Sequence, residues 1–217
     1  MTAFVDLSHA IEDGMTTYPG IPGPVITDHL SREESRRRYA SGIEFCLGRI
    51  DMVTNVGTYL DTPFHRYADG HDLSAIPLEA VAGVPIVVVD ATGPAVGADA
   101  LPDRPLGGTA VIVRTGWDRH WRTEAYGAGG HPHLVQDAVD RLVAERPTLV
   151  GIDSVNIDTT VGGERPAHSD LLAAGIYVLE HLTNLAALDG DGWELFAVPV
   201  KVVGIGTFPV RAFARRP

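Results

Sequence analysis

The segment Asn55-Val56-Gly57-Thr58-Tyr59-Leu60-Asp61-Thr62-Pro63-Phe64-His65 is the most informative stretch of this sequence. In it an aspartate and a histidine stand four residues apart, after a Gly-Thr turn and on either side of a proline. Pro63 lacks a backbone N–H and has a fixed φ, so we expect Asp61 and His65 in an irregular loop or at a strand end. Carboxylate oxygen and imidazole nitrogen both suit zinc or manganese. Taken alone, the pair is better explained as a turn cap and a satisfied buried histidine, because Asp-x-x-x-His is common by chance.

Length and composition indicate one globular domain spanning residues 1–217. The net charge of −11 argues against a nucleic-acid partner, because a phosphate backbone needs the opposite sign. Cys46 is the only cysteine, which excludes an intrachain disulfide and fits a reducing cytoplasm. Since Cys46 lies in the apolar run Phe45–Leu47, we expect it in the core. The sequence has neither a signal segment nor an apolar run of membrane-spanning length, so we expect a cytoplasmic protein without a membrane partner.

Strand patterns outnumber helix patterns and are spread along the whole chain. Strands are expected at residues 4–8, 43–53, 84–89, 110–114, 149–152 and 196–204, and either a strand or a helical turn at 176–179. Helices are expected at residues 133–145 and 169–174, with a loop at 14–24 and either a short helix or a mobile arm at 31–39. These patterns predict a mixed α/β domain and do not exclude a doubly wound sheet.

The segment from Asn55 to His65 resembles the signature of the metal-dependent cyclase family, which includes bacterial kynurenine formamidase and isatin hydrolase. That signature reads His-x-Gly-Thr-His-x-Asp-x-Pro-x-His, and here Asn55 and Tyr59 replace its first two histidines. Stretches in the style of the family also occur at residues 6–9, 18–20, 115–121, 151–158 and 199–204, so the resemblance covers essentially the whole chain. It implies a swivelling β/β/α fold with a mixed sheet, assembled into dimers or tetramers.

In this family, a histidine and a glutamate twelve residues further on complete a metal site, and His168 and Glu180 have that spacing. The resemblance implies two adjoining metal positions, one of them held by the two motif histidines. Asn55 and Tyr59 replace these histidines, so that position would lose its ligands. A neutral amide is a weak zinc ligand, and a phenol would have to lose a proton of pKa about 10. The resemblance therefore implies a single divalent metal, zinc or manganese, held by Asp61, His168 and Glu180.

On this hypothesis the protein hydrolyses a small cyclic or aryl amide, formamide or lactone. Asp61 serves the metal, His65 is the general acid or base or a fourth ligand, and Tyr59 and Asn55 are hydrogen-bonding groups for the substrate or the oxyanion. An aromatic wall for a flat substrate is expected from Tyr18, Phe64 and Trp117. Because the missing histidines are ones on which kynurenine formamidase activity relies in the family, the sequence favours family membership over that particular activity.

Two alternatives stay open. A metal-independent lyase, isomerase or cyclase would use Tyr59 and His65 as acid and base, and a non-catalytic protein would bind a small molecule on the same fold. The polar segment Asp153–Asp158 follows a buried strand, which fits either a site or turn chemistry for Asp153, Ser154 and Asp158.

Overall fold

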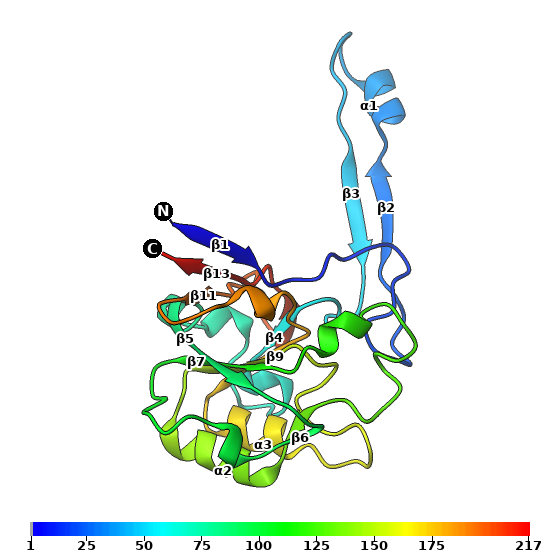
Figure 1. The fold of residues 1–217 in the computed structure, drawn as a ribbon. Helices are drawn as coiled ribbons and strands as arrows, with labels where there is room; N and C mark the ends of the chain where they lie inside the picture. The colour runs from blue at the N-terminus through cyan, green and yellow to red at the C-terminus, as the bar shows by residue number, and fades with distance from the viewer. Residues whose placement is uncertain (1) are drawn as a thin grey trace.

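A nine-stranded mixed sheet forms the centre of the protein in a computed structural model, which describes residues 2–217 (Figure 1). The strand order is β1-β13-β11-β5-β7-β9-β10-β4-β12. The strands are β1 (Ala3–Asp6), β4 (Tyr59–Asp61), β5 (Ala82–Asp90), β7 (Ala110–Arg114), β9 (Leu149–Ile152), β10 (Tyr177–Glu180), β11 (Glu194–Phe196), β12 (Thr207–Pro209) and β13 (Phe213–Arg216). The four central strands β5, β7, β9 and β10 run parallel, and the outer pairings are antiparallel. The predicted mixed α/β fold class is thereby confirmed.

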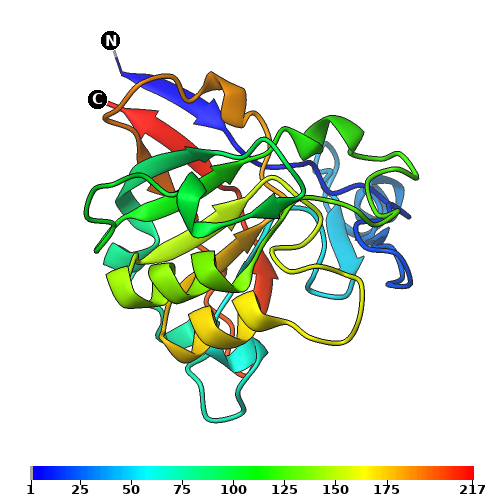
Figure 2. The ribbon, with the colours of Figure 1, turned by 60° about the horizontal axis from the view of Figure 1, so that its bottom comes forward.

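Helices α2 (Gln136–Glu145) and α3 (Pro166–Ala173) lie side by side on one face of the sheet (Figure 2). Side chains of the central strands alternate between the two faces, as the period of a strand requires. Val111 and Val113 of β7 pack in the apolar cluster that contains the helices, whereas Ala110 and Ile112 pack in the cluster on the opposite face. The continuous apolar strands of the sequence are therefore explained by burial on both faces.

Several element boundaries differ from expectation. Residues 133–134 form β8 (His133–Leu134), which pairs with β6 (Ala95–Val96), so the expected helix at 133–145 begins only at Gln136. The strand expected at 196–204 is wrong beyond Phe196. Its valines at 198, 200 and 203 are exposed, and within residues 2–217 no strand pairs with that stretch. Short 3₁₀ turns occur at Pro63–His65, Leu73–Ala75, Leu78–Ala80, Ala98–Ala100, Trp117–His120 and Leu185–Ala187.

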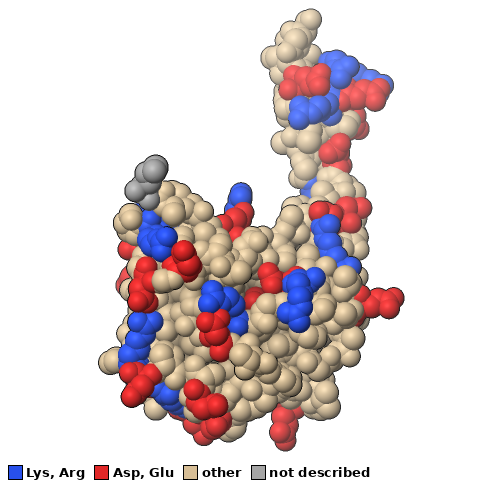
Figure 3. All heavy atoms as spheres, viewed as in Figure 1, with Lys and Arg blue, Asp and Glu red and all other residues tan. Residues whose placement is uncertain are grey.

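A two-stranded ribbon projects from the body of the protein (Figures 1 and 3). It consists of β2 (Val25–Leu30) and β3 (Leu47–Asp51), and helix α1 (Arg32–Arg38) lies at its tip. We call residues 25–51 the arm. The Ser31 hydroxyl accepts from the Glu34 N–H while Glu34 reaches back to the Ser31 N–H, and this capping box explains where α1 begins.

Cys46 lies exposed in the arm, so the expectation of a core position is wrong. Both strands of the arm are almost entirely exposed, which leaves no core there for the thiol to enter. In the described part of the chain, no helix has the length and apolar character needed to cross a membrane.

Candidate metal and catalytic site

The register of three strands assembles the centre of the site. Glu180 on β10 stands directly opposite Tyr59 on β4, and on the other side of β4 Thr207 of β12 stands opposite Asp61. Tyr59 and Asp61 are two residues apart on one strand and so project from the same face. Antiparallel pairing thus brings residues from three distant parts of the sequence onto one patch of the sheet.

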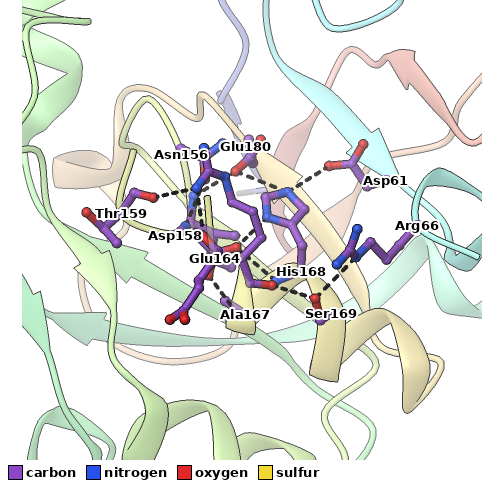
Figure 4. Close-up of polar contacts among 12 residues, drawn as sticks. Asp61, Arg66, Asn156, Asp158, Thr159, Glu164, Ala167, His168, Ser169 and Glu180 are labelled. Carbon is purple, nitrogen blue, oxygen red and sulfur yellow. Dashed lines mark hydrogen bonds and ion pairs between the residues drawn. The ribbon is translucent and has the colours of Figure 1, made fainter. Parts of the chain in front are cut away.

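His168 reaches this patch from the first turn of α3, and Asp158 orients its ring. The Asp158 carboxylate accepts a hydrogen bond from His168 Nδ1 at 2.6 Å, and it also accepts from the backbone N–H groups of Ala167 and His168 at the start of the helix. The remaining ring nitrogen, Nε2, lies 3.6 Å from Asp61 Oδ2 and 3.6 Å from Glu180 Oε1 (Figure 4). A carboxylate that fixes one imidazole nitrogen while the other faces acidic oxygens is typical of a metal-binding histidine.

Thr207 links Asp61 to His65. Its hydroxyl donates to Asp61 Oδ1 and lies 2.8 Å from His65 Nδ1, from which it can accept a hydrogen bond. This leaves Nε2 as the ring atom of His65 available to a ligand or substrate. Gly206 permits the close approach, because a Cβ at that position would lie 2.3 Å from the backbone nitrogen of His65. Sequence analysis missed Thr207, which follows the family-like stretch at residues 199–204 without any spacing that marks it.

The residues present fit a divalent cation. Ligand atoms of Asp61, His65 and His168 all lie within 4.8 Å of one another. Asp61 is fully buried, and its Oδ2 has no hydrogen-bond partner in the structure, which is costly for a carboxylate unless a cation satisfies it. Asp158 and Glu180 are buried as well, so three acidic groups surround one imidazole. Burial alone would lower the pKa of His168, but Glu180, Asp158 and Asp61 outweigh it and raise the pKa to about 10.

Glu180, which is predicted to be a metal ligand beside Asp61 and His168, makes two hydrogen bonds within the protein. Its Oε2 accepts from the Tyr59 hydroxyl at 2.7 Å, and its Oε1 accepts from the Ile157 N–H at 2.7 Å. Burial raises the pKa of this carboxyl group, while the neighbouring His168 opposes the rise. The cluster of candidate ligand atoms in the structure includes His65, the expected alternative fourth ligand, and the set Asp61, His168 and Glu180 stays a prediction.

Tyr59 belongs to a chain of buried hydrogen bonds. The Tyr59 oxygen lies 3.2 Å from His181 Nε2, and His181 Nδ1 lies 2.8 Å from the Tyr126 hydroxyl. Burial lowers the pKa of His181 to about 3, so its ring is neutral and carries one proton. The Tyr59 hydroxyl donates its hydrogen bond to Glu180, so it can only accept from His181. His181 must therefore donate from Nε2 to Tyr59 and accept at Nδ1 from the Tyr126 hydroxyl. Burial and the charges of Glu180 and Asp61 hold the pKa of Tyr59 well above its usual range, so the phenol keeps its proton.

A cavity of about 270 Å³ opens above these residues. Of the residues expected in the site, Tyr18, Asn55, Tyr59, His65, His168 and Glu180 line it. Phe64 and Trp117 do not belong to its lining, and Trp117 instead donates from Nε1 to the Tyr126 carbonyl and packs against His120. Four further residues line the cavity that sequence analysis did not single out: Ile21, Arg66, Asn156 and Arg165.

The sequence left open whether the segment Asp153–Asp158 serves a site or a turn, and the structure shows both within it. Asp153 accepts from the N–H and hydroxyl of Thr115 and from the Gly116 N–H, which is the turn chemistry of a buried loop anchor. The Ser154 hydroxyl lies 3.2 Å from His131 Nδ1. Asp158 contacts His168, the Ile157 N–H donates to Glu180, and Asn156 lines the cavity, so the second half of the segment belongs to the site.

These observations define a class of protein with a mixed α/β fold, in which buried acidic groups at the ends of two strands face histidines from a helix and a 3₁₀ turn. The family model named Cyclase matches residues 5–159, and the chain belongs to this family. The resemblance recognised at residues 55–65 is confirmed.

Individual relatives agree with this assignment. A kynurenine formamidase from Bacillus cereus is 28% identical over 214 residues, covering 98% of this chain and 97% of the relative. A crystal structure of an isatin hydrolase bound to the product analogue thioisatinate superposes with a TM-score of 0.84 at 22% identity, covering 100% of this chain and 93% of the other. A structure titled potential metal-dependent hydrolase with cyclase activity gives a TM-score of 0.80 at 24% identity, covering 100% and 99%. At these identities the two structures show the fold alone.

Proposed function

We propose that this protein is a metal-dependent hydrolase that cleaves a carbon–nitrogen bond in a small amide, with aryl formamides, cyclic amides and the related lactones as the substrate class. The observation that carries the proposal is the pairing of an oriented His168 Nε2 with the unpartnered, buried Asp61 Oδ2 beside a cavity. The kynurenine formamidase relative, aligned over nearly the whole chain, supports amide hydrolysis.

Asp61 and His168 would hold the cation, with His65 or Glu180 as a further ligand. A divalent metal bound there supplies Lewis acidity, which lowers the pKa of a water molecule and polarises a carbonyl group. Three protein ligands with one open position is the layout of a catalytic zinc site.

The protein's own groups provide the proton transfers and the orientation of the substrate. If His65 is not a ligand, its Nε2 takes a proton from the attacking water and returns it to the leaving amine, while Thr207 holds the ring through Nδ1. The Tyr59 hydroxyl is committed to Glu180, which leaves the Asn55 amide and the Tyr18 phenol as neutral hydrogen-bonding groups of the cavity lining.

Metal content and turnover, measured together, test this proposal. The purified protein is loaded with zinc or manganese, dialysed, analysed for metal and assayed with formanilide, beside the variants Asp61→Asn, Glu180→Ala and His65→Ala. We expect about one metal per wild-type chain and its loss in Asp61→Asn. Retention of metal with loss of turnover in His65→Ala would identify a base, and loss of both would identify a ligand. A wild-type protein that retains no metal and turns over no amide or lactone would refute the proposal.

A further inference from the structure

Two arginines line the catalytic cavity without an acidic partner. Arg66 directly follows His65, and Arg165 directly precedes α3. Arg66 donates from Nε to the Ser169 hydroxyl at 3.2 Å (Figure 4), and Arg165 donates from Nη1 to backbone carbonyl groups of the loop before α3. Within residues 2–217, most other arginines form an ion pair with a carboxylate, whereas neither of these does.

These two positive side chains line one cavity in a protein whose net charge is −11. The interior side of the same cavity is acidic, since Glu180 lines it and Asp61 lies buried behind it. The cavity lining therefore combines a buried negative region suited to a cation with the positive side chains of Arg66 and Arg165. Both guanidinium groups keep free N–H donors, because Arg66 uses only Nε and Arg165 only Nη1.

We propose that the substrate carries a carboxylate in addition to the bond that is cleaved, and that Arg66 binds this carboxylate, with Arg165 as a second positive charge in the same cavity lining. A planar guanidinium matches a carboxylate with two parallel hydrogen bonds, and such charge-assisted bonds are stronger than neutral ones. Holding the carboxylate at Arg66 directs the scissile carbonyl toward His65 and His168, which line the same cavity. This inference rests on the proposed hydrolase function and narrows its substrate class to carboxylated amides.

The two roles of Arg165 determine the choice of variants. Arg165 bridges three carbonyl groups of its own loop, so its replacement would disturb the loop as well as the charge. Arg66 is exposed and its side chain forms a single hydrogen bond, to Ser169, so Arg66→Gln is the cleaner test, with Arg66→Lys as the variant that keeps the charge. Arg104→Gln is a matched control, since it also removes one exposed positive charge but lies outside the cavity lining.

The experiment compares formanilide with its ortho, meta and para carboxylated derivatives. We expect wild type and Arg104→Gln to prefer at least one carboxylated isomer in kcat/KM. In Arg66→Gln this preference should fall about 10- to 100-fold, mainly through KM, because one charge-assisted hydrogen bond is worth roughly 1.5–3 kcal/mol. Arg66→Lys should restore part of the preference. Equal loss for the neutral and carboxylated substrates, or an unchanged preference, would overturn the inference.

Binding of benzoate, measured by calorimetry against neutral benzyl alcohol, separates this inference from the proposed function. If none of the amides is hydrolysed but wild type binds benzoate and Arg66→Gln does not, the hydrolase proposal fails and the carboxylate site stands. If formanilide is hydrolysed while benzoate binding and substrate preference are the same in wild type and Arg66→Gln, the hydrolase proposal stands and the carboxylate site is refuted.

Discussion

Thr207 is the residue on which the alignment of Asp61 and His65 depends. Replacing it with valine keeps the shape and removes both hydrogen bonds, leaving Asp61 Oδ1 buried without a donor. We expect Thr207→Val to lower kcat by about 10- to 100-fold, as for loss of a group that orients a metal ligand or catalytic base. Steady-state kinetics with formanilide measure this, and Thr207→Ser should recover most of the activity. A Thr207→Val enzyme with kcat near wild type would exclude an orienting role.

Tyr59 distinguishes the metal-dependent mechanism from the metal-independent alternative. In the structure its phenol keeps its proton and donates a hydrogen bond to Glu180. Tyr59→Phe should therefore weaken metal binding about 10- to 100-fold through Glu180, while turnover is largely recovered at saturating metal. Competition with a chromogenic chelator measures the affinity. Complete loss of turnover with unchanged metal affinity would instead support Tyr59 as the acid of a lyase or isomerase.

His9 makes stability depend on pH. Its ring stacks on Trp121 with centroids 3.9 Å apart, and burial, opposed by Asp118, lowers its pKa from 6.5 to about 4. The unfolded chain therefore binds this proton first as the pH falls, so stability decreases between pH 6.5 and about 4. We expect His9→Phe, which retains the stacking, to flatten this decrease in urea titrations. The exposed His29→Gln serves as control, and an equal flattening in both variants would contradict the assignment.

Individual site residues were predictable only where local sequence marked them. Asp61 and His65 share one short motif, and the spacing of His168 and Glu180 completed the expected set. Thr207 could not be predicted, because it meets Asp61 only through the pairing of β4 with β12, 146 residues away along the chain. Arg66 and Arg165 carry no pattern, and only the cavity shows that they lie near the same site.

At the scale of elements, Asp158 links the start of helix α3 to the candidate metal site. Its carboxylate accepts from two N–H groups at the helix start and from His168 Nδ1. Asp158→Asn should lower the free energy of unfolding by about 1 kcal/mol or more, as for loss of a helix-capping acid, and weaken metal binding about 10- to 100-fold. Calorimetry and chelator competition measure the two effects. Asp170→Asn on the same helix, where the carboxylate accepts a hydrogen bond from Gln136, should change neither, and parallel changes in it would contradict this role.

Predictions of strands succeeded where burial leaves a clear pattern in the sequence. They failed where a strand is defined only by its pairing with a distant segment. Strands β7 and β9 are continuous apolar runs buried on both faces, and their ranges agree with expectation. Strands β2 and β12 have no such pattern, because β2 is almost entirely exposed and β12 has only three residues. Conversely, the alternating valines after Phe196 read as a strand but find no partner strand among the described residues.

At the scale of the whole molecule, the arm is a feature that the folded chain alone does not account for. A two-stranded ribbon with both faces in solvent is marginally stable by itself. In addition, the arm exposes several large apolar side chains, among them Val25 and Ile50, with exposed fractions of 54% and 57%. Figure 3 shows that charged groups gather around α1 near the tip, while fewer lie on the shaft, by which we mean strands β2 and β3. Exposed apolar side chains grouped in this way form the kind of surface that association buries.

The predicted homo-oligomer, a dimer or tetramer, therefore has a specific test in the arm. If a second copy of this chain covers the shaft, Ile50→Glu places a charge in the interface and should reduce the mass of the particle in light scattering coupled to gel filtration. Leu78→Glu, at a side chain that is 65% exposed and lies outside the arm, should leave that mass unchanged. A wild-type monomer, or a mass unaffected by Ile50→Glu, would rule out the arm as the contact between copies. Because Tyr18 and Ile21 of the cavity lie only a few residues before β2, loss of association should also raise KM if the arm stabilises that edge of the cavity.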